Sequence, residues 1–171
     1  SLFLAVVVGI LTTALGLVFA LVLTRSGFRY KRALRALTVL PIITPPFVIG
    51  LAIILLFGLS GMATTWLADL IGVRPTRWVY GLPGVMIAQV LALTPIAFLV
   101  LIGVVEGVSP SMEEAAQTLR ATRWQTFRTV SLPLMRPGLA NAFLLGFIES
   151  MADFGNPLVL GGNYDVLSTE I

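Results

Sequence analysis

The segment EEAAQTLRATRWQTFRTVSLPLMRP, from Glu113 to Pro137, stands between two long apolar runs. It contains adjacent acids, several arginines and a tryptophan, whereas 57% of the whole chain is hydrophobic and only 11% is charged. Soluble domains carry about 25% charged residues. The composition therefore predicts a membrane protein, and this segment predicts a polar excursion out of the bilayer.

The uncharged runs on both sides are long enough to be membrane helices, because about 20 apolar residues cross the hydrocarbon core. We expect an all-α integral membrane unit over residues 1–171, with spans at about 2–23, 37–57, 83–105 and 137–151. A break at GLSGM and a short interfacial helix over 63–71 should follow the second span. The prolines of PIITPPFVIG predict either a packing kink or a pore-lining bend within that span.

The basic residues gather on two loops and thereby predict the orientation. Short loops rich in Lys and Arg stay in the cytoplasm. The loop over 106–136 is therefore expected on the cytoplasmic side and residues 152–171 on the outer side. The net charge of +3 fits this membrane pattern and does not call for a nucleic-acid partner. The two basic groups comprise Arg25, Arg29, Lys31, Arg32, Arg35, Arg120, Arg123, Arg128 and Arg136.

Several kinds of chemistry are excluded by residues that the sequence lacks. The chain has no Cys and no His, so thiolate and imidazole metal ligands and the commonest general base are missing. No phosphate-binding loop of the form GxxxxGK[ST] occurs. We expect no catalytic residue, no metal site and no cofactor. The apolar run begins at Ser1 without a basic leader and the sequence stops at Ile171, so we expect a fragment of a longer protein.

The loop over 106–136 contains helix signals of its own. Ser109 followed by Pro110 is a good helix start, because proline suits the first helical position. A capping box of Ser111 with Glu114 is an alternative start. Either start predicts a short helix in the first half of the loop.

A second helical piece is expected over 124–130, with Pro133 and Pro137 ending it before the next span. The loop should then be a helix–turn–helix on the cytoplasmic face. Its small, acidic and apolar side chains favour a docking surface for a partner. The alternative is an amphipathic helix that rests on lipid headgroups. The candidate docking residues are Glu113, Glu114, Ala115, Ala116, Leu119, Arg120 and Trp124.

The spacing in this loop resembles that of permeases of binding-protein-dependent ABC importers of the type I fold. Their loop reads E-A-A, three residues, G, nine residues, I, one residue, L-P. This chain has EAA at 114–116 and VSLP at 130–133, with the same spacing. Arg120 stands in the glycine place, which is a departure at a position where a tight turn is expected.

The resemblance implies a type I ABC importer transmembrane bundle in which the helix from Glu113 to Arg120 is the coupling helix. It implies a cytoplasmic ABC ATPase dimer that holds this helix, so that ATP is hydrolysed on a separate subunit. An extracytoplasmic solute-binding protein and a second permease unit, in the same chain or a second copy, are also implied. The location would be the bacterial inner membrane. The stretch ESMADFGNPLVLGGNYDVLSTEI is similar to the first half of iron(III) permeases, so iron(III) or a related small solute is the implied cargo.

Acidic residues near the outer end suggest a route for that cargo. Glu149 and Asp153 are four residues apart and should share one helix face. Ionisable groups at membrane depth usually face the interior or water, so these acids with Asn156 would suit a cation in transit. The alternative is that Asp153 already lies at the outer interface and that Glu149 pairs with a polar break in the backbone near Gly155 and Pro157. A secondary transporter or channel coupling ions through the two acids is the alternative function, although it has no need for the loop spacing.

Glycines give two further expectations. The stretch GNPLVLGGN is rich in turn formers and predicts an irregular outer loop. Gly103 and Gly107 form a small-xxx-small pair that would suit close helix packing.

Overall fold

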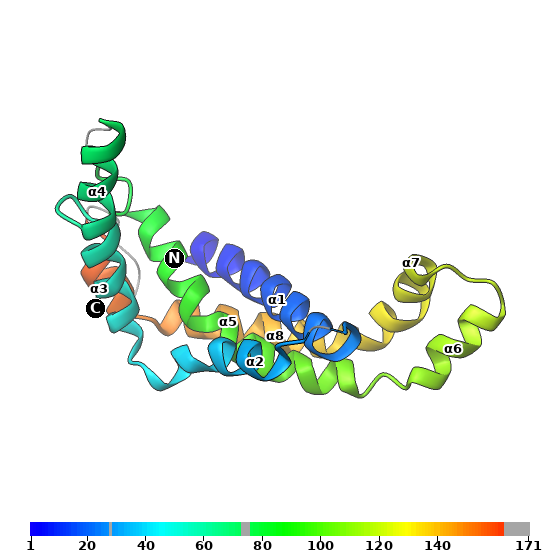
Figure 1. Cartoon of the computed structure of the whole chain (residues 1–171). Coiled ribbons are helices and arrows are strands. Elements are labelled where there is room, and N and C mark those ends of the chain that lie inside the picture. Colours follow the sequence, from blue (N-terminus) through cyan, green and yellow to red (C-terminus); the bar gives the residue numbers. More distant parts are fainter. Residues whose placement is uncertain (28, 73–75, 163–171) are drawn as a thin grey trace.

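The computed structural model describes residues 1–27, 29–72 and 76–162, and its longest helices form a bundle (Figure 1). Three long helices each contact the other two: α1 (Leu2–Arg25), α5 (Leu82–Glu106) and α8 (Leu132–Ala152). The remaining elements are α2 (Lys31–Val39), the 3₁₀ helix η1 (Leu40–Ile43), α3 (Pro46–Phe57), α4 (Met62–Ile71), α6 (Pro110–Thr118), α7 (Arg123–Thr126), the π-helix η2 (Phe127–Ser131) and α9 (Gly155–Leu160).

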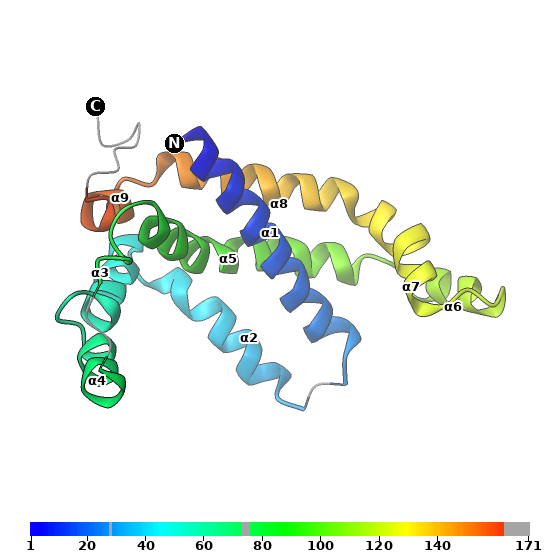
Figure 2. The same cartoon turned by 90° about the horizontal axis from the view of Figure 1, so that it is seen from above.

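The two ends of the bundle carry different parts of the chain. At one end, α6 and α7 project beyond the long helices, and the ends of α1 and α5 lie beside them (Figure 2). At the other end lie the N-terminus, α3 and α9, and the last two pack together. The segment highlighted by the sequence therefore extends from one end, while the acids near residue 150 belong to the other.

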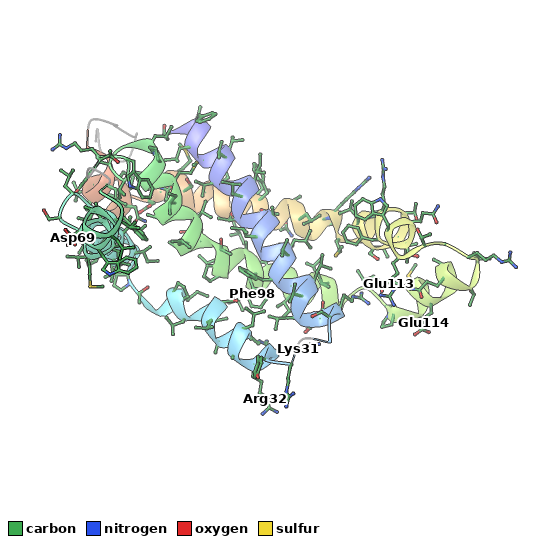
Figure 3. All side chains as sticks on the ribbon, turned by 45° about the horizontal axis from the view of Figure 1, so that its top comes forward. Lys31, Arg32, Asp69, Phe98, Glu113 and Glu114 are labelled. Atoms are coloured by element: carbon green, nitrogen blue, oxygen red, sulfur yellow. The ribbon has the colours of Figure 1, made fainter. Side chains whose placement is uncertain are left out.

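The interior of the bundle is apolar and is centred on α5. Phe98, in the middle of α5, is fully buried (Figure 3). One buried cluster surrounds it and a second lies toward the end of the bundle that carries α9. The first cluster comprises Ala20, Leu23, Ala97, Phe98, Leu101, Ile102, Val105, Val108, Met135 and Ala142. The second comprises Leu4, Val8, Ile53, Val79, Val85, Ala88, Leu93 and Leu160.

Small residues let the long helices approach closely. A Cβ added at Gly16 of α1 would lie 2.9 Å from the Ala97 carbonyl carbon on α5. A Cβ at Gly138 of α8 would overlap the Val104 side chain. Gly103, in contrast, has nothing within 4 Å of the corresponding position. The expected close packing through Gly103 is therefore wrong for contacts within the described residues.

The helices predicted from the first and third uncharged runs are present. α1 covers the expected 2–23 and α5 covers the expected 83–105. Both end at the first charged residue, Arg25 and Glu106 respectively, where the chain can reach water. Within the described part of the chain, the stretches long and apolar enough to cross a membrane are Leu2–Arg25, Phe47–Leu70, Leu82–Glu106 and Arg123–Ala152.

The single helix expected over 37–57 is not formed. α2 ends at Val39, η1 ends at Ile43, and α3 begins at Pro46. Pro45 has ψ of 139°, because a residue that precedes proline is driven out of the helical region. The prolines therefore end one helix and start another. The expected break at GLSGM is present between α3 and α4, and α4 covers the short helix expected over 63–71.

The last long helix, α8, begins at Leu132, before Pro137. α7, η2 and α8 follow one another without a gap, and Pro137 lies inside α8. The expectation that Pro133 and Pro137 end the preceding helix is wrong. Pro133 falls at the start of α8, directly after the π-helical turn, where the Leu132 amide donates to the Phe127 carbonyl. The helical path therefore continues through a π-helical turn into α8, although Pro133 has no amide proton to donate.

The outer segment is partly helical. Residues 155–160 form α9, although an irregular loop is expected there. The Asp153 carboxylate accepts a hydrogen bond from the Asn156 backbone amide at 3.2 Å. This bond satisfies an N–H of the first turn of α9 that has no partner within the helix. The remainder of the expected outer loop, residues 163–171, lies outside the described residues.

Candidate functional site

The polar hairpin consists of α6, α7 and the turn between them. α6 begins at Pro110 with Ser109 as its N-cap, as one of the two expected starts predicts. The alternative capping box of Ser111 with Glu114 is not formed, because Ser111 already lies inside the helix and its hydroxyl contacts that of Ser109 at 2.7 Å.

The turn after α6 is retained despite the missing glycine. Arg120 has φ of 63°, and among the described residues no other non-glycine residue has positive φ. Glycine adopts this left-handed conformation freely, whereas a residue with a Cβ adopts it at a cost. The turn expected at the motif's glycine position is therefore present and is made by an arginine.

α7 starts with a capping box that the sequence interpretation did not use. The Gln125 amide donates to the Thr122 hydroxyl at 3.3 Å, and the Thr122 amide donates to the Gln125 side-chain oxygen at 2.8 Å. The signal was present as T-x-x-Q. This box fixes the direction in which the chain returns from the turn toward α8.

The outward face of the hairpin carries large apolar groups. Leu119 is 83% exposed and Trp124 is 67% exposed. The Trp124 ring stacks on Phe127 with centroids 5.8 Å apart, which holds the indole in place. Glu114, on α6 (Figure 3), is exposed and forms no hydrogen bond or ion pair within the described residues. Ala115 is also exposed.

Glu113 differs from the other candidate docking residues, because its carboxylate is already occupied. Arg25 of α1 donates to it at 2.6 Å, and the Ser131 hydroxyl donates to it at 2.6 Å. The side chain of Glu113 is 20% exposed. Among the described residues, Glu113 is thus engaged with the bundle, whereas Glu114 forms no hydrogen bond or ion pair, although both acids line the same pocket between α6 and the bundle.

At the opposite end of the molecule, buried polar side chains join α5, α8 and α9. Gln89 donates to the Asp153 carboxylate at 2.9 Å, and the Ser150 hydroxyl donates to the Gln89 side-chain oxygen at 2.7 Å. The Asn156 side-chain amide donates to the same carboxylate at 2.8 Å. Gln89 and Asn156 are almost completely buried. Donors thus surround Asp153, which lies beyond the end of α8 and not on its face as expected.

Glu149 lies apart from this network. It lines a pocket of about 320 Å³ together with Phe47, Leu93 and Asn156. Within the described residues it forms no hydrogen bond or ion pair, so the expected pairing near Gly155 is absent. Of the two acids expected in the cargo route, Asp153 is held by donors, whereas Glu149 has no hydrogen bond or ion pair to the described residues.

The sequence interpretation overlooked Gln89 and Arg25. Gln89 is a polar residue in an otherwise uncharged run, a pattern that often marks a buried hydrogen bond. Arg25 ends an apolar run, where a lone cation is ordinarily attributed to orientation. In the described part of the chain, no group of three or more Asp and Glu residues is placed to hold a metal ion.

Comparison with known families agrees with this geometry. A family model described as a binding-protein-dependent transport system inner membrane component matches residues 12–170. The chain belongs to this family. As a member of this inner membrane family with several apolar helices, it is a multi-pass inner membrane protein.

Several transport permeases resemble the chain over all or most of its length. It is 50% identical over 171 residues to the ferric transport system permease protein FbpB of Actinobacillus pleuropneumoniae. It is 51% identical over 171 residues to the putative ferric transport system permease protein FbpB 1 of Haemophilus influenzae. The chain covers only 25% and 27% of these relatives, about a quarter of their length. The sulfate transport system permease protein CysT of Escherichia coli is 35% identical over 159 residues, 93% of this chain and 56% of that protein.

The fold of the family is also found in a solved structure. A bacterial alginate ABC transporter, in complex with an alginate pentasaccharide-bound periplasmic protein, contains a chain that superposes with a TM-score of 0.81. The match covers 99% of this chain and 62% of the other, at 18% sequence identity. At that identity the likeness establishes the shared fold.

Proposed function

We propose that this chain is the first part of a permease that imports iron(III), or a related small solute, using ATP hydrolysed on a separate ABC ATPase dimer. The solute arrives from an extracytoplasmic binding protein. A second permease unit, in the same chain or a second copy, completes the pathway. The observation that carries the proposal is that the α6–α7 hairpin, which has the E-A-A to L-P spacing of the family, exposes Leu119 and Trp124.

The hairpin has the features of a docking site for a protein. Leu119 and Trp124 expose large apolar surfaces on a hairpin that is otherwise rich in polar side chains. Aromatic side chains at the centre of a contact contribute much of its binding energy. The exposed Glu114 carboxylate can accept a bidentate arginine from the partner. Ala115 and Ala116 leave room for a backbone to approach. Together these groups fit a cleft on a cytoplasmic ATPase.

The opposite end is proposed to meet the binding protein and to pass the solute inward. The basic loops place the hairpin in the cytoplasm by the positive-inside rule, so α9 and the pocket beside Glu149 would face outward. A pocket carboxylate that pairs with none of the described residues favours a cationic solute over an anion. This agrees with relatives at 50% and 51% identity that are named as ferric permeases, against 35% for a sulfate permease.

The proposal is tested by co-purification of the ATPase with the complete permease from membranes. Glu114→Arg should abolish capture of the ATPase, because it reverses the charge at the exposed centre of the hairpin. Glu106→Arg is the matched control, since Glu106 is exposed at the same end of the bundle but lies outside the hairpin. Capture that survives Glu114→Arg contradicts the docking site. Transport of Fe(III) by the permease without any ATPase would favour a secondary transporter or channel instead.

A further inference from the structure

The last residue of α1 reaches across to the hairpin. Arg25 donates from one nitrogen to the Glu113 carboxylate at 2.6 Å and from the other to the Val108 carbonyl at 3.2 Å. Val108 lies in the linker between α5 and α6. A single guanidinium thus contacts both the linker that leads into α6 and the first turn of α6 itself.

The Glu113 carboxylate extends the same connection to α8. Its second oxygen accepts the Ser131 hydroxyl at 2.6 Å. Ser131 is buried at the end of η2, directly before α8 begins. Arg25 and Glu113 therefore connect α1, the end of α5, α6 and the start of α8.

Apolar packing does not supply this connection. α6 buries no residue, and it packs against α7 and η2. A pocket of about 610 Å³, lined by Arg25, Glu113, Glu114 and Met135 among others, lies between α6 and the bundle. The Arg25 and Glu113 side chains are 30% and 20% exposed, so the ion pair adds little stability by itself. Its effect is to fix the position of α6 relative to α1.

We propose that Arg25 and Glu113 are a positioning pair that transmits displacement of α6 to α1 and α8. This inference rests on the proposed function, in which a nucleotide-driven partner moves the hairpin. A rigid link makes the long helices follow α6, whereas a hairpin without the link swings on its linker. Glu113 is then a transmitting residue, and the neighbouring Glu114 is the docking residue.

The test uses the complete permease reconstituted in vesicles with its ATPase and its solute-binding protein, and radiolabelled Fe(III) as the probe. Glu113→Gln should keep ATPase capture and ATP hydrolysis while uptake of Fe(III) per ATP falls roughly tenfold, within the usual range of coupling between sites. Arg25→Gln should lower the same ratio to a similar degree. The double variant should be no worse than either single variant, because the residues act as one unit. Arg25→Lys, which keeps the charge, should restore part of the ratio.

Glu106→Gln is the matched control, and it should leave the ratio unchanged. An unchanged ratio in Glu113→Gln and Arg25→Gln, with the ATPase bound, overturns the positioning role and leaves the proposed function standing. Loss of ATPase capture in Glu113→Gln also overturns it, because Glu113 would then be a docking residue. Failure of the unmodified permease to capture any ATPase rejects the proposed function itself.

Discussion

The Ala121 amide donates a hydrogen bond to the Ala116 carbonyl at 3.1 Å, across the end of α6. The Arg120 amide donates to the Gln117 carbonyl at 2.9 Å. These bonds make a Schellman turn, which requires a left-handed residue at the position of Arg120. The two hydrogen bonds hold Arg120 in the left-handed conformation. A glycine would adopt this conformation without a steric penalty, whereas the Cβ of Arg120 makes it unfavourable.

Arg120→Gly should stabilise the permease by about 1 kcal/mol, because it removes the steric penalty of a Cβ at positive φ. The measurement is thermal unfolding of the detergent-solubilised complete permease. Arg120→Ala is the control, since it removes the charged side chain but keeps the Cβ. If alanine stabilises as much as glycine, the penalty comes from the arginine side chain and not from the backbone.

The helices α1 and α5 could be predicted from length and charge alone. α1 and α5 occupy uncharged runs that are each bounded by a charged residue, so the sequence marks their ends. The break at Pro45 was harder to place, because no charge accompanies it. The proline pair does carry the signal, since Pro46 restricts the residue before it to extended backbone.

Contacts between distant segments could not be predicted. Arg25 and Glu113 are 88 residues apart, and nothing in the local pattern pairs them. The π-helical turn before α8 has no sequence signature of its own either. The expectation that Glu113 and Glu114 share a role follows from their adjacency, yet neighbours on a helix point about 100° apart. The structure separates them for this reason.

Gly16→Ala should destabilise the bundle by about 1–3 kcal/mol, because the added methyl meets the α5 backbone, which cannot move aside as a side chain can. Gly103→Ala is the matched control within the same bundle. It has open space at the Cβ position and should be neutral or slightly stabilising, since alanine favours helix. Thermal unfolding of both variants in one detergent measures the difference. Equal losses in the two variants would contradict close contact between α1 and α5.

Gln89→Met should destabilise the permease by about 1–3 kcal/mol, because it keeps the shape of the side chain but leaves the buried Ser150 hydroxyl without its acceptor. Asp153 also loses one of its donors. Gln117→Met is the control, since Gln117 is exposed on α6. The midpoint temperature of thermal unfolding should fall for Gln89→Met and remain constant for Gln117→Met. A constant midpoint in both would show that the network contributes nothing.

Glu149→Gln should slow Fe(III) uptake by a factor of about five without changing stability, as expected for the loss of one charge contact worth about 1 kcal/mol in water. The physical reason is that Glu149 lines the pocket beside Phe47 and Asn156 and bonds to none of the described residues, so its charge is available to a cation. The measurement is uptake of radiolabelled Fe(III) into vesicles that contain the complete permease, its ATPase and its binding protein.

Asp69→Asn is the control for Glu149→Gln, because Asp69 is an exposed carboxylate on α4 outside the pocket. It should leave uptake unchanged. If Glu149→Gln also leaves both the uptake rate and the preference for Fe(III) unchanged, the pocket is not on the cargo route. Asp153 would not replace it in that role, since donors from Gln89 and Asn156 already hold its carboxylate.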